Sequence, residues 1–208
     1  VTRFRCEPDR RRLVQVVQVV PPVRLVRLVQ VVQVVHPRGV AFGSALVARA
    51  RADVDRVVEV GAHNSGPIVD GYLANVGGSP GDNWCAAAAW TWTRDAATTS
   101  GAPAILAAVP ATGGAKAYAE GPKARGWWLD AGAVSSPADV PPGSVAIWDR
   151  SDPPGSGWQG HIGVVEEWTG PAAWRSIEGN SGPAGDRVAR MERPLDDPRL
   201  LGFVVWGR

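Results

Sequence analysis

Among the two cysteines and three histidines of this sequence, Cys85 and His161 are the candidates for covalent catalysis. We expect Cys85 in the first turn of a helix that Asp82 or Asn83 can cap. Backbone N–H groups and the helix dipole favour an anion there, and the thiolate is the nucleophilic form of cysteine. The negative charge of Asp82 disfavours the thiolate. The alternative to a nucleophile is a buried cysteine that packs as a small apolar side chain.

His161 opens an expected strand and follows a loop rich in glycine and proline. A neutral imidazole can accept the thiol proton and later return a proton to a leaving amine. The alternative is a polar residue at the end of a strand. Catalysis is favoured only if a third group orients the ring.

A hairpin would supply that third group. Residues 161–168 and 173–180 flank a short turn, which predicts two antiparallel strands. One register sets Glu178 opposite His161 and the other sets Asn180 there, with the remaining residue a diagonal neighbour about 7–8 Å away. A carboxylate or an amide beside the imidazole fixes its tautomer, although an ordinary polar pair across two strands has the same appearance.

The elements that must position these groups divide into helices followed by strands. This order predicts an α+β domain in which N-terminal helices pack on a C-terminal antiparallel sheet. The expected helices are 45–60, a short one from Pro67, one from Cys85 to about Thr98, and one or two within 113–126; the expected strands are 144–149, 161–168, 173–180 and 199–206.

The first 45 residues differ from the rest, and we expect the domain to span 46–208. Polar residues or proline recur at every third position from Gln15 to His36, which fits neither a helix nor a strand. A β-solenoid fragment, a membrane-surface segment and a low-complexity tail are three interpretations. The tail is favoured, and no function is assigned to it.

Composition excludes several classes. Residues 1–50 hold nine of the 22 Lys and Arg but two of the 20 Asp and Glu, so the remainder is mildly acidic and nucleic acid is not expected as a partner. Two cysteines make no disulfide scaffold. No long uninterrupted apolar run predicts a transmembrane helix, no export signal is evident, and we expect a monomer.

Ten tryptophans are many for 208 residues. Trp84 adjoins Cys85, Trp148 ends an expected strand and Trp158 precedes His161, so these three could line a cleft for a peptide or a sugar. Core packing is the alternative for each. With Asn83, they are the candidate substrate-binding residues.

Five segments in this order resemble the CHAP family of cysteine, histidine-dependent amidohydrolases and peptidases, within the wider NlpC/P60-like group of papain-fold enzymes. They are NSGPIVDGYL (64–73), NWCAAAAW (83–90), PPGSVAIWD (141–149), GHIGVVEEW (160–168) and SIEGNSG (176–182). The resemblance covers roughly residues 55–205. Two features depart from the family pattern: Ser144 stands where an aspartate is usual, and the helix after Cys85 is unusually rich in alanine.

The resemblance implies that Cys85 is the nucleophile, His161 the general base and acid, Glu178 the group that orients His161, and Asn180 a fourth member. It implies hydrolysis of an amide in peptidoglycan, either between muramic acid and L-alanine or within the stem or cross-bridge peptides, outside the cell or in the cell wall. No cofactor is expected. No metal is expected either, because Asp70 and Asp82 stand apart where some relatives cluster aspartates for calcium.

Two other functions remain open from the sequence. One is a non-catalytic module of the same fold that binds cell wall. The other is an amidase or acyltransferase that acts on a different amide inside the cell.

Overall fold

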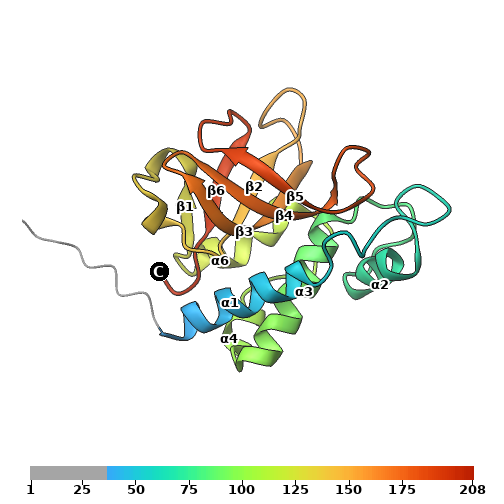
Figure 1. The fold of residues 1–208 in the computed structure, drawn as a ribbon, viewed down its shortest axis with the longest axis horizontal. Coiled ribbons are helices and arrows are strands. Elements are labelled where there is room, and N and C mark those ends of the chain that lie inside the picture. Colours follow the sequence, from blue (N-terminus) through green and yellow to red (C-terminus); the bar gives the residue numbers. More distant parts are fainter. Residues whose placement is uncertain (1–36) are drawn as a thin grey trace, which may run out of the picture. The chain divides into compact units, whose positions relative to one another are not determined.

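The computed structural model describes residues 37–208, and the prediction for the period-three segment lies outside these residues. The described chain is an α+β domain, as expected (Figure 1). Its α-helices are α1 (Pro37–Arg51), α2 (Pro67–Asn75), α3 (Cys85–Ser100), α4 (Pro103–Leu106), α5 (Ala115–Tyr118) and α6 (Glu120–Ala124). Its strands are β1 (Trp128–Asp130), β2 (Val145–Asp149), β3 (Gly160–Gly170), β4 (Ala173–Ser181), β5 (Arg187–Pro194) and β6 (Leu200–Val204). Within this part of the chain, no helix has the length and apolar character to cross a membrane.

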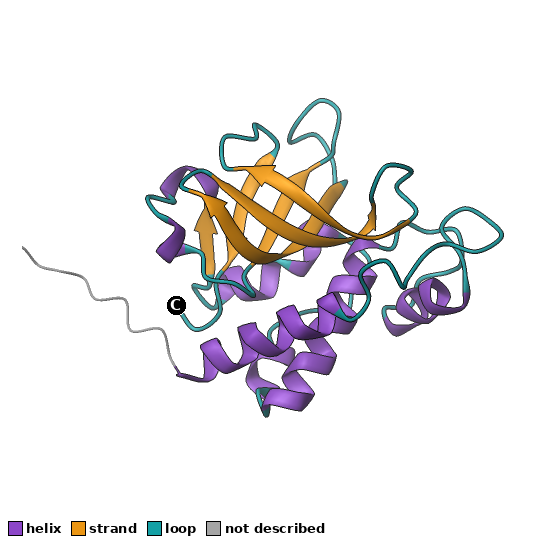
Figure 2. Ribbon diagram, in the orientation of Figure 1, coloured by secondary structure: helices purple, strands orange, loops and turns teal. Residues whose placement is uncertain are grey.

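The strands form one antiparallel sheet in the order β1-β6-β2-β3-β4-β5. Helices α1 and α3 lie beneath one of its faces (Figure 2). Neighbouring side chains of a strand alternate between the faces, so Ile147 and Val164 pack toward the helices while Trp148 and Val165 pack in a second core on the other face. The sheet is therefore buried on both sides.

Helix α1 begins at Pro37 and ends at Arg51, which corrects both the expected helix 45–60 and the expected domain start at 46. Phe42, Leu46 and Ala50 recur at helical spacing and are fully buried, so the first turns belong to the core. The domain therefore includes residues that we expected in the tail.

Helix α3 begins at Cys85, as expected, but without the predicted cap. Trp84 occupies the capping position and provides no side-chain hydrogen bond, while Asp82 accepts the backbone N–H of Ser79 instead. The alanines that depart from the family pattern allow the helix to pack closely on the sheet, because a Cβ at Gly179 of β4 would lie 2.9 Å from the Cβ of Ala88. Small residues on both elements therefore bring the start of α3 to the end of β4.

All four expected strands are present as β2, β3, β4 and β6. The sequence analysis missed β1, which is three residues long, and β5, whose sequence RVARMERP contains four charged residues. Strand β5 lies at the edge of the sheet, where an exposed, charged strand is tolerated. Its position beside β4 proves important for the site.

Candidate active site

The first turn of α3 holds Cys85 at the wall of a cavity. The side chain is a free thiol and is 6% exposed. A cavity of about 370 Å³ is lined by Cys85 together with His161, Asn180 and Asn83. The first N–H groups of α3 lack partners within the helix, so an anion beside them is stabilised.

His161 lies between Cys85 and Glu178. Its Nε2 is 2.7 Å from Oε2 of Glu178, and Cys85 lines the same cavity as His161, close enough to raise the pKa of the imidazole. Burial lowers the pKa of His161, but the nearby Cys85, together with the hydrogen bond and negative charge of Glu178, outweighs burial and raises this pKa to about 9. At neutral pH the structure therefore favours an imidazolium beside the sulfur.

The register of the hairpin explains how Glu178 reaches the imidazole. Val164 pairs with Ile177, and the same register continued along the strands sets Gly163 opposite Glu178 and His161 opposite Asn180. The diagonal contact forms because Gly163 has no side chain: a Cβ there would lie 2.7 Å from Cγ of Glu178. Glu178 lies across this glycine and bonds His161, although it is not the directly opposed residue.

The carboxylate of Glu178 is fully buried and has polar partners on both oxygens. Ser176 donates to Oε1 at 2.5 Å and Ser181 donates to Oε2 at 3.2 Å. Arg193 of β5 donates through Nε to Oε1 at 2.8 Å and through Nη2 to Oε2 at 2.5 Å. Burial raises the pKa of Glu178, but the bonds and charges of His161 and Arg193 prevail and hold it far below its usual range, so the group stays ionised.

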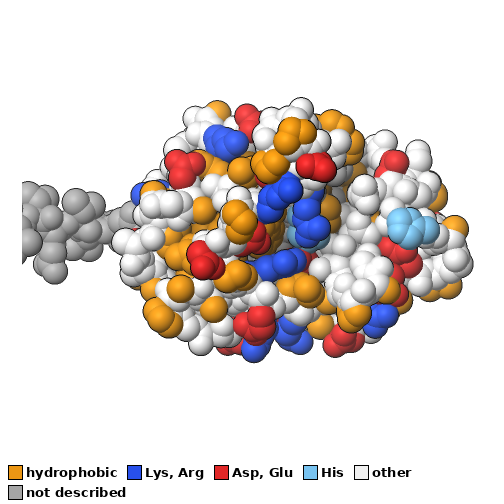
Figure 3. Space-filling model, turned by 90° about the horizontal axis from the view of Figure 1, so that it is seen from above, with side chains coloured by type: hydrophobic (Ala, Val, Ile, Leu, Met, Phe, Trp, Pro, Cys, Tyr) orange, Lys and Arg blue, Asp and Glu red, His pale blue; other side chains and the backbone are white. Residues whose placement is uncertain are grey.

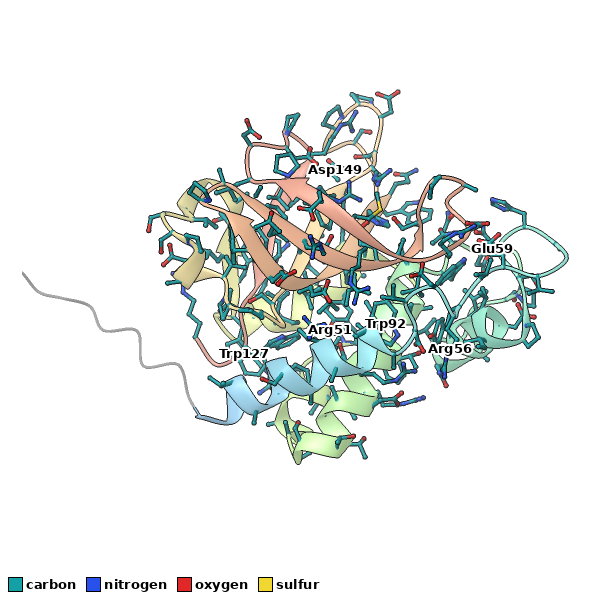
Figure 4. The ribbon with its side chains drawn as sticks, viewed as in Figure 1. Arg51, Arg56, Glu59, Trp92, Trp127 and Asp149 are labelled. Carbon is teal, nitrogen blue, oxygen red and sulfur yellow. The ribbon has the colours of Figure 1, made fainter. Side chains whose placement is uncertain are left out.

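Asn180 lines the cavity but its side chain faces a different set of partners. It has a left-handed backbone, φ +53°, within an irregularity of the β4–β5 pairing. Its Nδ2 donates to Oδ1 of Asn64 at 2.8 Å, to the backbone oxygen of Gly185 at 3.0 Å and to Glu59 at 3.3 Å (Figure 4). No hydrogen bond among the described residues joins it to His161, so of the two residues that the sequence left open, Glu178 is the one that contacts the imidazole.

The loop between β2 and β3 forms one rim of the cavity and is anchored at its start by Asp149 (Figure 4). This carboxylate pairs with Lys116 at 2.6 Å, and it accepts hydrogen bonds from Ser151 and from the backbone N–H of Gly155. The hydrogen bond from Lys116, followed by those from Ser151, holds the pKa of Asp149 well below its usual range. Lys116 also donates to the backbone oxygen of Gly157, which ties the far part of the loop to α5.

That loop presents Trp158, which is 70% exposed. Trp158, Asn83 and Gly113 are shared by the cavity at Cys85 and by a second one of about 400 Å³, which Leu73, Val76 and Asp82 also line. The two hollows therefore adjoin each other. The expectation that Trp158 and Asn83 line a cleft agrees with these positions.

The other two tryptophans are placed differently. Trp84 is fully buried and its indole donates to Glu59 at 2.8 Å, so the expectation that it lines the cleft is wrong. Because Trp84 and Cys85 are consecutive residues, their side chains leave the start of the helix in different directions. Trp148 is 2% exposed and pairs across the strands with His161, with ring centroids 5.9 Å apart. It supports the imidazole from behind and borders a further hollow beyond Arg150.

Three partners of Glu178 were missed by the sequence analysis: Ser176, Ser181 and Arg193. Ser176 lies two residues before Glu178 and Ser181 three residues after it, and nothing in the sequence around either serine predicts a contact with this carboxylate. Arg193 lies in the strand that was not predicted. Within residues 37–208, no group of three or more His, Cys, Asp or Glu side chains is arranged to hold a metal ion.

Comparison of the chain with protein-family models, with curated proteins and with solved structures finds no match.

Proposed function

We propose that this chain is a cysteine amidase or peptidase with a papain-like, CHAP-type domain that hydrolyses an amide bond of peptidoglycan. The observation that carries the proposal is the buried series Cys85, His161, Glu178, in which the thiol and the imidazole line one cavity and the imidazole bonds the carboxylate. A histidine with only a structural role requires neither a nearby thiol nor a carboxylate whose two oxygens both accept hydrogen bonds. The resemblance of the five sequence segments supplies the substrate class.

The first half-reaction forms a thioester. The Cys85 sulfur attacks the carbonyl carbon of the scissile amide, and a tetrahedral oxyanion forms. The backbone N–H of Cys85 and the side chain of Asn83, which lines the same cavity, are the groups available to donate to it. The imidazolium of His161 gives its proton to the leaving nitrogen as the C–N bond breaks, and the acyl group stays on sulfur.

The second half-reaction returns the enzyme. Neutral His161 takes a proton from water, the hydroxide adds to the thioester carbon, and the C–S bond breaks to release the carboxylic acid and the thiolate. Glu178 holds the ring through Nε2 in both halves, so the other nitrogen faces Cys85 and the substrate. Its ionised carboxylate stabilises each imidazolium that forms.

Mass spectrometry of fragments tests the proposal. The full chain is incubated with purified peptidoglycan, and the released pieces are analysed for new amino and carboxyl ends. A free muramic lactyl carboxylate with a free L-alanine amine identifies an amidase, whereas new ends within the peptides identify an endopeptidase. Tight wall binding without any released fragment would instead support the non-catalytic wall-binding module.

A further inference from the structure

The cavity at Cys85 adjoins, at Arg150, a hollow that the proposed reaction does not use. This hollow has a volume of about 390 Å³ and is lined by Trp148, Arg150, Arg193, Asp197 and Arg199. Arg150 also lines the cavity at Cys85 and His161, so the two spaces share a wall. Asp149 donates its backbone N–H to Arg199, which brings the β2–β3 loop and the β5–β6 connection together at the same end of the sheet (Figure 1).

The charges of this hollow are not all available to a ligand. Arg193 is engaged by Glu178, and Asp197 accepts the backbone N–H of Arg199 at 2.9 Å. Arg199 uses Nη1 to donate to the backbone oxygen of Ser151 at 2.6 Å, which fixes its side chain and leaves further N–H groups.

Arg150 is the donor with the most freedom. It is exposed, and within residues 37–208 its guanidinium makes no hydrogen bond or ion pair to another side chain. Figure 3 shows this face of the molecule, on which Lys and Arg side chains gather beside a histidine. The hollow therefore offers the guanidinium groups of Arg150 and Arg199 beside the cavity that Cys85 lines, with the carboxylate of Asp197 to offset them.

We propose that Arg150 and Arg199 form a subsite for a carboxylate of the substrate, carried on the same peptide as the scissile amide. A planar guanidinium binds a carboxylate through two parallel N–H donors and discriminates against a neutral carboxamide, which lacks the charge. This inference rests on the proposed function and narrows its substrate. The enzyme takes stem peptides with free carboxylates in preference to stem peptides in which those groups are amidated.

The test compares two soluble muropeptides that differ only in amidation of their side-chain carboxylates. We measure kcat/KM on each for the wild type, Arg150→Gln, Arg150→Lys and Arg125→Gln, all as full chains. Arg125 is an exposed arginine over the ring of Trp127 and lines none of these hollows, so it is the matched control.

The wild type and Arg125→Gln should prefer the free acid by about tenfold, which corresponds to about 1.4 kcal/mol. Arg150→Gln should reduce the preference to about one, and Arg150→Lys should retain part of it.

A binding measurement separates this inference from the proposed function. Calorimetry on Cys85→Ala, with and without Arg150→Gln, compares the affinities for the same two peptides without turnover. If the wild type cleaves both peptides equally, or if Arg150→Gln keeps the preference, the subsite is refuted while the amidase stands. If neither peptide is cleaved but the free acid binds more tightly in an Arg150-dependent way, the subsite stands and the amidase falls. Equal binding without cleavage overturns both.

Discussion

Arg193 holds both oxygens of the Glu178 carboxylate, through Nε at 2.8 Å and Nη2 at 2.5 Å, while His161 bonds the same carboxylate through Nε2. A buried carboxylate between two cations stays charged, and a charged Glu178 acts with Cys85 to raise the pKa of His161. The edge strand β5 therefore contributes to the candidate active site through Arg193, which does not line the cavity at Cys85.

Replacement of Arg193 by Gln should destabilise the fold by about 3 kcal/mol, because it leaves a buried carboxylate with one cation fewer. Arg175→Gln is the matched control: Arg175 lies on β4 and pairs with Glu167 and Glu192 at the surface, where the loss should be below about 1 kcal/mol. Denaturant unfolding of the two variants measures both effects. Equal losses would show that the Arg193–Glu178 pair is no more than a surface ion pair.

Stability should depend on pH through His161. Its pKa rises from 6.5 to about 9 on folding, so its contribution is fully present below pH 6.5 and is lost as the pH rises through 9. The free energy of unfolding should therefore fall between these pH values. Glu178→Gln removes one of the negative charges that raise this pKa and should flatten the slope, whereas Glu192→Gln, on the exposed side of β5, should keep it. An unchanged slope in Glu178→Gln would contradict the role of Glu178.

Gly163→Ala should displace Glu178, since the added Cβ would lie 2.7 Å from its Cγ. We expect kcat to fall by about tenfold or more and stability to fall by about 1–3 kcal/mol from overpacking. Gly170→Ala on the same strand adds a methyl group that meets nothing within 4 Å, so it should leave both quantities unchanged. Wild-type kcat in Gly163→Ala would show that the diagonal contact does not matter for turnover.

Trp158→Ala should weaken substrate binding, because this exposed ring borders both of the adjoining hollows. KM should rise by about fivefold with little change in kcat or stability, since an aromatic contact contributes about 1 kcal/mol. Ile68→Ala is the control, as Ile68 is also an exposed apolar side chain, at 41%, but borders neither hollow. A fall in kcat at constant KM would instead place Trp158 in the chemical step.

Much of the fold and the centre of the candidate site follow from local sequence patterns. Short apolar segments between turn residues mark β2, β3, β4 and β6, and the hairpin brings Glu178 within reach of His161. Glu178 reaches the imidazole because Gly163 has no side chain in its path. This role of Gly163 can be recognised only once the register of the two strands is known.

The remaining errors share a cause, which is that tertiary contacts decide what local sequence leaves open. Helix α1 starts at Pro37 because Phe42 finds a place in the core, although the preceding period-three segment conceals the helical pattern. Arg193 is one charged residue among several in β5, and only the position of that strand beside β4 identifies its partner. Trp84 adjoins Cys85 in sequence and yet packs away from the cavity.

The central claim is that Cys85 is the nucleophile, and one measurement tests it most directly. Purified peptidoglycan is treated with the wild type, with Cys85→Ala and with Cys6→Ala, which alters the only other cysteine of the chain. After circular dichroism has verified that each variant is folded, the release of new amino groups is followed over time. We predict that the wild type and Cys6→Ala release them at equal rates and that Cys85→Ala releases none above background. Release by Cys85→Ala at the wild-type rate would contradict the account.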